Sequence, residues 1–322
     1  MSLGIIAILS SPSSFTENGE MDKIRAVISE GTGIFHYEVE KHKDIAEALG
    51  RFSQVDVDVI AILGDRALTS ATFEHILEKD LLKSKDIPLA ILPAGDNNIV
   101  AENFGANRSE PHKALEDLLK FHRQGRLLDT ITECPLLKLE GVRGIGYLYG
   151  LFFCAGIIIK KKSLFKRKIS ARGLFSRFRN WLSIIRLVQA AYRRAMGKQK
   201  LEDAIRINRN QRGAVVGSYF MLLISTLDKA FWGVSIGQEK RQDRAHFISV
   251  ENTPKAILET GKLMLRGNYD GIDHAGNIIA EIQHARIVLK TPFVLDGSYY
   301  EADDNGELFV TVTDSLKFIQ LG

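Results

Sequence analysis

Three carboxylates of this sequence lie one to four residues after the end of a short apolar run, where loops able to do chemistry would lie. They are Asp65, Asp96 and Asp296. A carboxylate at the end of a strand suits a network of Mg²⁺ and water, and an ionised carboxylate can accept the proton of a hydroxyl group. Aspartate also favours turns and helix N-caps. Capping by Asp65 and Asp96, and a plain turn at Asp296, are therefore open alternatives.

The elements that must position the first two carboxylates alternate between apolar runs and helical spacing over residues 1–128. Strands are predicted at Ile5–Leu9, Phe35–Val39, Val55–Leu63 and Ile87–Leu92, and helices at Met21–Glu30, Asp44–Ser53, Thr72–Leu82 and Pro111–Gly125. This alternation predicts an α/β domain with a mostly parallel sheet. Such sheets bind ligands beyond the carboxyl ends of their strands. The loops expected there are Ser10–Asn18, Gly64–Ser70 and Pro93–Asn98.

Residues 129–313 have a different pattern, in which strand-like runs dominate. The runs are Leu136–Leu139, Tyr147–Cys154, Ala204–Arg209, Ala214–Ser225, His246–Val250, Ala285–Leu289, Phe293–Leu295 and Leu308–Val312. Asn305-Gly306 lies between two such runs and is a hairpin signal. We predict a second domain that is an antiparallel β-sandwich or barrel-like structure, with a helical insertion at 160–200.

The insertion is the strongly basic part of an otherwise acidic chain. Residues 160–200 contain 14 Lys/Arg and no Asp/Glu, whereas the rest of the chain has 29 basic and 39 acidic residues. Apolar residues recur there every three or four positions at Leu174, Phe178, Trp181, Leu182, Ile185 and Val188. A basic amphipathic helix with aromatic residues is typical of proteins that bind anionic membrane surfaces. A helix packed on its own domain is the alternative, and nucleic acid is not expected because no nucleic-acid motif accompanies the charge.

Composition excludes a disordered chain, a collagen and a polytopic membrane protein. The chain has 322 residues, of which 45% are hydrophobic and 25% charged, as in an ordinary globular protein. No apolar run is long enough for a transmembrane helix, and the first residues lack the charged region of a signal peptide. Cys134 and Cys154 have neither a metal-binding spacing nor a disulfide framework. We therefore expect a cytoplasmic protein, peripheral at the membrane if the basic helix binds lipid.

Two loops, with the late Asp296-Gly297, resemble the diacylglycerol kinase catalytic domain family. The loops read Leu63-Gly64-Asp65-Arg66-Ala67 and Leu92-Pro93-Ala94-Gly95-Asp96-Asn97-Asn98. The marks of that family, in the same order, are G-G-D-G-T, L-P-x-G-T-x-N-D and D-G-E. The family includes bacterial lipid kinases and sphingosine kinases and is related to NAD kinases. The resemblance extends over essentially the whole chain except the basic insertion.

The resemblance implies an activity and a set of site residues. An N-terminal nucleotide-binding domain would hold ATP and Mg²⁺, the C-terminal β-sandwich would take a lipid substrate, and residues 314–322 would return to the first domain. Asp296 would be the catalytic base for phosphorylation of a lipid hydroxyl. The cofactor-binding positions would be Gly64, Asp65, Arg66, Pro93, Ala94, Gly95, Asp96 and Asn98, with Asp65 and Asp96 as metal ligands.

Several positions depart from the family pattern. Leu63 and Arg66 replace the two glycines whose small size lets backbone amides approach the phosphates. Asp96 stands where the second motif has threonine, and Ser298 where the late motif has glutamate. Arg66 adds bulk, although its guanidinium could pair with a phosphate. A catalytically impaired relative, acting as a lipid- or membrane-binding regulatory module, is therefore the second interpretation.

Overall fold

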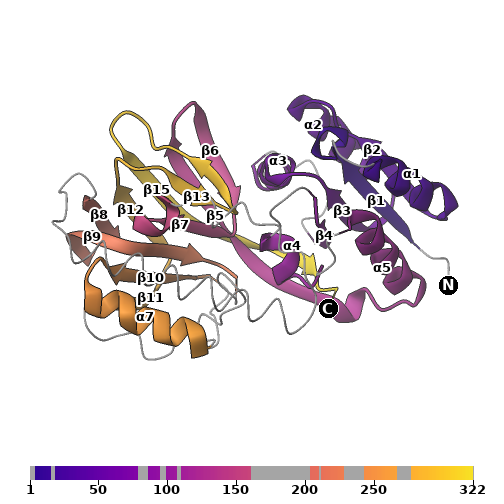
Figure 1. The fold of residues 1–322 in the computed structure, drawn as a ribbon. Coiled ribbons are helices and arrows are strands. Elements are labelled where there is room, and N and C mark those ends of the chain that lie inside the picture. The colour runs from indigo at the N-terminus through magenta and orange to yellow at the C-terminus, as the bar shows by residue number, and fades with distance from the viewer. Residues whose placement is uncertain are drawn as a thin grey trace. The chain divides into compact units, whose positions relative to one another are not determined.

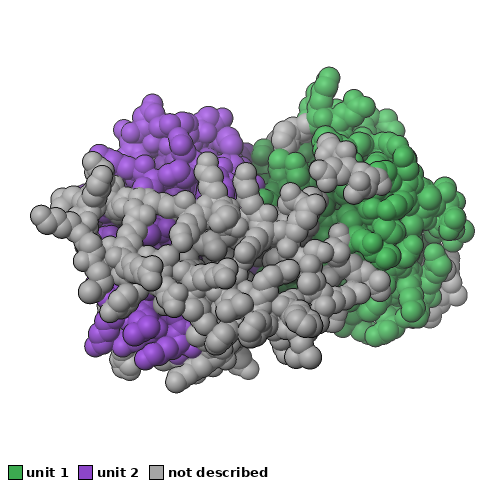
Figure 2. Space-filling model, in the orientation of Figure 1, with its two compact units in different colours: residues 1–134, 315–322 green, residues 135–314 purple. Residues whose placement is uncertain are grey.

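The chain divides into two compact units, which Figure 2 colours separately. A computed structural model describes residues 4–15, 19–78, 86–94, 99–106, 110–160, 204–209, 212–227, 243–266 and 277–321. Unit 1 comprises Met1–Cys134 and Ser315–Gly322, and unit 2 comprises Pro135–Asp314. Apart from Lys160, the basic segment lies outside the described residues, so its predicted helix remains a prediction. Among the helices described, none is both long and apolar enough to cross a membrane.

Unit 1 contains a parallel sheet with the strand order β2-β1-β3-β4 (Figure 1). The strands are β1 (Ile5–Ser10), β2 (Ile34–Glu38), β3 (Val57–Leu63) and β4 (Leu89–Leu92). The central strand β3 is a nearly continuous apolar run. Such a run is expected for a strand that has neighbours on both sides and is buried on both faces. The predicted α/β organisation with parallel strands is confirmed.

Helices cover both faces of this sheet. They are α1 (Glu20–Glu30), α2 (His42–Phe52), α3 (Arg66–Leu77), α4 (Ile99–Asn103) and α5 (Pro111–Arg123), with 3₁₀ turns at Pro12–Ser14 and Leu128–Thr130. α1 packs beside α5, and α2 beside α3. Residues of α1 and α5 share a core with Ile6, Ile8 and Val59 of the sheet. Ala7 and Ile60 are also buried, and they point to the opposite face because strand side chains alternate.

Helix α3 begins earlier than the sequence pattern predicted. We expected a loop from Gly64 to Ser70 and a helix from Thr72, but α3 starts at Arg66. Thr and Ser lower helix propensity because their hydroxyls compete for backbone groups. Here the hydroxyls of Thr69 and Thr72 donate to carbonyls four residues back, at 3.2 and 2.8 Å, and so they are compatible with the helix.

Unit 2 is rich in antiparallel strands, as predicted. The strands are β5 (Ile131–Val142), β6 (Ile145–Gly150), β7 (Phe152–Ala155), β8 (Ala204–Arg209), β9 (Arg212–Ser225), β10 (Ala245–Glu251), β11 (Asn277–Ile282), β12 (His284–Val288), β13 (Phe293–Leu295), β14 (Ser298–Tyr300) and β15 (Glu307–Ile319). A 3₁₀ turn covers Ile157–Lys160 and helix α7 covers Pro254–Arg266. The strands of unit 2 pair in the order β14-β13-β7-β9-β8-β12-β15. Strand β10 also pairs with β9 and with β11, and β5 pairs with β6.

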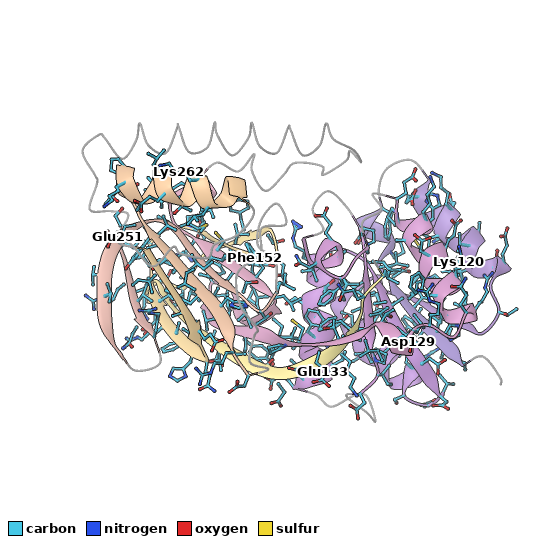
Figure 3. All side chains as sticks on the ribbon, turned by 90° about the horizontal axis from the view of Figure 1, so that it is seen from below. Lys120, Asp129, Glu133, Phe152, Glu251 and Lys262 are labelled. Carbon is cyan, nitrogen blue, oxygen red and sulfur yellow. The ribbon has the colours of Figure 1, made fainter. Side chains whose placement is uncertain are left out.

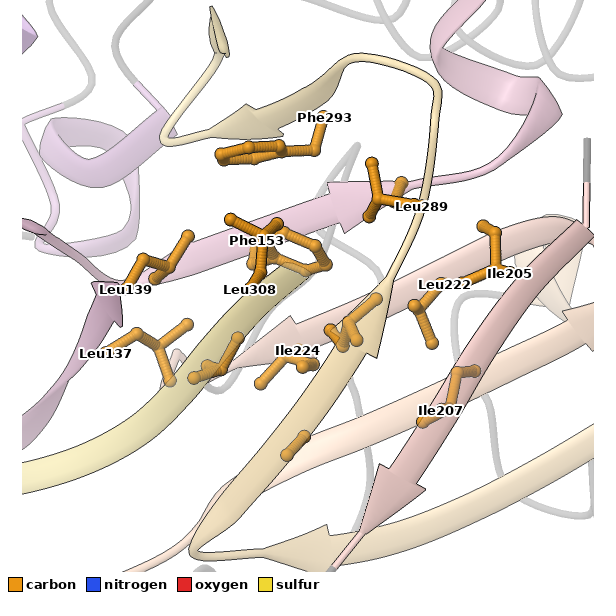
Figure 4. Packing of buried hydrophobic residues seen from close by; sticks show 14 of the residues in the cluster. Leu137, Leu139, Phe153, Ile205, Ile207, Leu222, Ile224, Leu289, Phe293 and Leu308 are labelled. Atoms are coloured by element: carbon orange, nitrogen blue, oxygen red, sulfur yellow. The ribbon is translucent and has the colours of Figure 1, made fainter. Parts of the chain in front are cut away.

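One hydrophobic core holds the strands of unit 2 together. Strand β9 pairs with β8 along its first half and with β7 and β10 along its second half. It therefore connects β8 with β7 and β10. Figure 4 shows the resulting core, in which Leu137, Ile207 and Ile224 are among the buried residues. All but one residue of β10 are buried, and α7 packs against this strand (Figure 1).

Three details of unit 2 differ from the sequence pattern. The run Tyr147–Cys154 is two strands, because the chain leaves β6 at Gly150 and starts β7 at Phe152. Asn305-Gly306 forms a turn in which Gly306 has φ +71°, but β14 pairs with β13 and not with β15. Helix α7 had no counterpart in the predicted pattern.

Strand β15 passes from unit 2 into unit 1. Its first part pairs antiparallel with β12 from Glu307 to Thr311. Near its end, Phe318 pairs in parallel register with Leu89 of β4. Strand β15 therefore has an antiparallel partner, β12, and a parallel partner, β4. The alternation of apolar runs did not indicate this connection.

Candidate functional site

The first candidate loops lie together at the carboxyl edge of the parallel sheet in unit 1. Because β1, β3 and β4 are parallel neighbours, their last residues Ser10, Leu63 and Leu92 end at the same edge. The Ser11 amide donates to the Leu63 carbonyl at 3.0 Å. These contacts bring the segment after β1 against the segment after β3.

Asp65 is the N-cap of α3. Its Oδ1 accepts a hydrogen bond from the Leu68 amide at 3.0 Å, and its own amide donates to Ser14 Oγ at 2.9 Å. Such a cap stabilises a helix by about 1 kcal/mol. The capping interpretation of Asp65 therefore describes a real contact, while the residue itself remains exposed at the sheet edge.

The two residues before Asp65 are directed towards the interior of unit 1. Leu63, which replaces the first family glycine, is fully buried in the core of unit 1. It therefore adds no bulk at the sheet edge. A Cβ on Gly64 would lie 2.3 Å from Leu68 Cδ2, so the glycine makes room for the packing of Leu68.

Arg66 is the first residue of α3 and is half-buried. A cation in the first turn of a helix opposes the helix dipole, by about 0.3–1 kcal/mol at exposed positions. An anion bound beside Arg66 would reverse the sign of this effect. Arg66 thus destabilises α3 when no ligand is bound. It would stabilise the complex if a phosphate group binds beside it.

The second loop is described only at its start. Pro93 and Ala94 follow β4, and Ala94 is 5% exposed. Gly95, Asp96 and Asn98 lie outside the described residues, so the predicted metal pair of Asp65 and Asp96 remains a prediction. Within the described residues, no cluster of three His, Cys, Asp or Glu side chains could hold a metal ion.

Asp296 lies in unit 2, in the two-residue turn that joins β13 to β14. Its φ is +48°, and that of Gly297 is +90°. Positive φ at both central residues is the requirement of a type I′ turn, for which Asp-Gly is a preferred sequence. Among the described residues, Asp296 is the only non-glycine residue with a positive φ.

The carboxylate of Asp296 points inward, and the residue is only 7% exposed. Oδ1 accepts hydrogen bonds from the amides of Leu151 at 3.0 Å and Phe152 at 2.8 Å, and Oδ2 accepts from Leu151 at 3.2 Å. The Asp296 amide in turn donates to the Phe152 carbonyl at 2.8 Å. These bonds fix the carboxylate at the break between β6 and β7, close to Phe152, which Figure 3 labels.

Two titratable residues of unit 1, Glu102 and His36, were not singled out from the sequence. Glu102 lies on α4, shortly after the second loop, and burial raises its pKa to about 7. Ser10 Oγ shares a hydrogen bond of 2.7 Å with His36 Nε2, and burial lowers the pKa of His36. Neither environment can be predicted from the sequence, because each depends on which residues cover the side chain.

Three solved structures of Bacillus anthracis proteins share the fold of this chain. One is described as a diacylglycerol kinase, with a TM-score of 0.60 at 11% identity, covering 99% of this chain and 98% of that one. Two others, each described as a "putative diacylglycerol kinase", align with TM-scores of 0.61 and 0.62, also at 11% identity and over 99% of this chain, covering 97% and 98% of theirs. The chain has the fold of the bacterial diacylglycerol kinases.

Other comparisons add little to this fold assignment. A yeast NADH kinase aligns with a TM-score of 0.48 at 8% identity, covering 99% of this chain and 84% of that one. We draw no inference from that level of similarity. The sequence matches no protein-family model and no curated protein.

Proposed function

We propose that this protein is an ATP-dependent lipid kinase, in which unit 1 binds the nucleotide and unit 2, as a β-sandwich domain, binds the lipid. The observation that carries the proposal is the buried carboxylate of Asp296. A type I′ turn also accepts asparagine at this position, which would avoid burying a charge. The turn alone therefore does not explain why the position is an aspartate, whereas a catalytic base would.

The groups at the sheet edge of unit 1 fit the phosphates of ATP. The first turn of α3 directs backbone amides to this edge, the hydroxyl of Ser14 lies against Asp65, and Arg66 supplies a guanidinium. The donor chemistry at Asp65 also fits Mg²⁺, which prefers oxygen ligands and retains several waters. ATP with Mg²⁺ would supply the phosphoryl group for the reaction.

In this proposal, Asp296 removes the proton from the hydroxyl of the lipid. The amides of Leu151 and Phe152 hold the carboxylate in a single orientation, and the positioning of a base is part of its catalytic effect. A carboxylate has about four acceptor sites. The carboxylate that the amides of Leu151 and Phe152 orient is the group that would accept the proton.

The proposal is tested with Asp296→Asn in the full chain. We expect this variant to keep the turn and to bind Mg²⁺-ATP as the wild type does, but to lose about 10²–10⁴-fold in turnover because the base is removed. The assay measures phosphate transfer from labelled ATP to lipids with a free hydroxyl, diacylglycerol first. Equal turnover in the two proteins would contradict the assignment of Asp296 as the base.

A second candidate function is a non-catalytic lipid- or membrane-binding module. The contacts of Asp65 favour it, because Oδ1 caps α3 and so satisfies an amide that a phosphate would otherwise use. Calorimetric titration of the wild-type protein with Mg²⁺-ATP separates the two candidates. No binding at millimolar ATP, together with binding to lipid vesicles, would leave the non-catalytic module as the function.

A further inference from the structure

The end of β15 packs against both helices that follow the candidate loops of unit 1. Phe318 is fully buried, and its ring stacks on that of Phe104 with a centroid distance of 4.4 Å and an interplanar angle of 10°. It also meets Phe73 edge-on at 6.0 Å and 87°. Phe73 lies on α3, which follows the loop after β3, and Phe104 directly follows α4, which comes after the loop of β4.

Backbone and ionic contacts attach the same segment to the strand before the second loop. Phe318 pairs with Leu89 at the start of β4. Lys317 Nζ contacts Asp86 Oδ1 at 2.7 Å, and the Leu321 amide donates to the Phe104 carbonyl at 2.9 Å. The segment from Ser315 to Leu321 thus contacts the chain both before and after the loop that contains Pro93 and Ala94.

These contacts bear on the edge strand β4. It has only four residues, and β3 occupies one of its sides. On the other side, which would otherwise be an open sheet edge, Phe318 of β15 pairs with Leu89 at the start of β4. A short strand that is paired with β3 throughout and anchored by Phe318 at its start gives Pro93 and Ala94 a fixed starting point. Phosphate-binding groups act only when their geometry is fixed.

We propose that Phe318 is a positioning residue for the nucleotide-phosphate site of unit 1. Its ring sits against Phe73 of α3 and against Phe104, directly after α4. It therefore restrains the end of α4 and also α3, the helix whose first residue, Arg66, would contact the phosphates in the proposed function. The proposal rests on the proposed function for the identity of the ligand. Its structural part, that Phe318 restrains α4, can be measured without any activity.

The test compares Phe318→Leu with Phe52→Leu in the full chain. Phe52 is a matched control because it is also fully buried in unit 1 and meets another ring, that of Phe35, edge-on at 5.3 Å. It lies on α2, which follows β2, whereas α3 and α4 follow the loops after β3 and β4. Phe104→Leu is a second test variant, which removes the same stacked pair from the other side if Phe318→Leu does not fold.

The first measurement is hydrogen exchange at the amides of Phe104, Gly105 and Ala106, which follow α4 and donate to carbonyls within it. We expect exchange about tenfold faster in Phe318→Leu and Phe104→Leu, because loss of a packed aromatic pair lowers the cost of local opening. Phe52→Leu should leave these amides unchanged. Equal exchange in Phe318→Leu and Phe52→Leu would overturn the proposal.

The second measurement is Mg²⁺-ATP affinity by calorimetry. We expect it to fall about fivefold or more in Phe318→Leu and to stay unchanged in Phe52→Leu, as the geometry of the phosphate site is what is lost. Faster exchange combined with wild-type ATP affinity would overturn the positioning role. Faster exchange combined with no ATP binding by the wild type would instead contradict the proposed function and leave Phe318 as the residue that restrains α4.

Discussion

Gly150 leaves the space that the carboxylate of Asp296 occupies. A Cβ on Gly150 would lie 2.6 Å from Asp296 Oδ2 and 2.8 Å from Leu295 Cγ. These distances are shorter than van der Waals contact, so no other residue fits at position 150 unless the side chains of Asp296 and Leu295 shift. The end of β6 and the turn between β13 and β14 are therefore mutually dependent, although they are distant in sequence.

We predict that Gly150→Ala displaces Asp296 and destabilises unit 2 by about 1–3 kcal/mol, the usual effect of overpacking. Urea unfolding measures the change in the free energy of unfolding. Gly146→Ala is the control, because Gly146 lies on the same strand and its Cβ would meet nothing within 4 Å. A Gly150→Ala variant as stable as Gly146→Ala would show that Asp296 is not held at this place.

Arg66→Gly tests whether the arginine pairs with a phosphate. If it does, Mg²⁺-ATP affinity should fall by about 1.5–3 kcal/mol, the typical contribution of a hydrogen bond to a charged group. Arg66→Lys keeps the charge but loses the planar fork, so its affinity should be intermediate. Calorimetry measures all three proteins. Tighter binding by Arg66→Gly would mean that the arginine obstructs the site and that the loop has lost its nucleotide function.

The pKa of Glu102 predicts a specific pH dependence of stability. Burial raises this pKa from 4.5 to about 7, so the folded protein keeps a proton that the unfolded chain has already released. The stabilising effect of protonation is complete below about pH 4.5 and is lost as the pH rises to about 7.

Glu102→Gln should therefore be more stable than the wild type above pH 7, by roughly 2 kcal/mol, and nearly equal to it near pH 4. Urea unfolding at pH 4, 6 and 8 measures this difference. Glu116→Gln, on the exposed side of α5, is the control and should show no such trend. A constant difference across these pH values in Glu102→Gln would contradict the burial of this carboxyl group.

The basic segment predicts binding to vesicles that contain anionic lipid. Replacing its arginines by glutamine at Arg177, Arg179, Arg186, Arg193 and Arg194 should release the protein from such vesicles. Binding by the wild type should weaken in salt, because the screening length falls from about 10 Å at 0.1 M to about 3 Å at 1 M.

A control variant with the same change in charge isolates the effect of position. It replaces exposed arginines of the described units by glutamine, at Arg51, Arg123, Arg126, Arg143 and Arg286. Sedimentation with anionic vesicles measures binding. If both variants sediment equally, net charge alone accounts for binding, and if the segment variant sediments like the wild type, the segment has no role at the membrane.

The spacing of apolar residues along the sequence predicted those helices and strands well in which buried residues recur at a regular interval. The strand Val57–Leu63 is an uninterrupted apolar run apart from Asp58 and was recognised almost to the residue. The start of α3 was missed because Thr69 and Thr72 resemble loop residues until their hydroxyls bond to the helix backbone. Helix α7 was missed because its flanks are strand-rich.

The candidate site shows the limit of sequence reasoning more clearly. The sequence indicated that Asp65 and Asp296 end apolar runs, and both do follow strands. It could not indicate that Asp296 binds the amides of Leu151 and Phe152, about 145 residues away, because those donors carry no side-chain signal. The pKa of Glu102 is equally non-local, since it depends on which residues cover the carboxyl group.

The path of β15 has a consequence for the order in which the protein folds during synthesis. The ion pair of Lys317 with Asp86 spans 231 positions, and the whole of unit 2 is translated between these two residues. Contacts of such separation form late, because a long loop must close before they are gained. The nascent parallel sheet therefore emerges from the ribosome with the outer side of β4 unpaired. The sheet is complete only after the last strand has been synthesised.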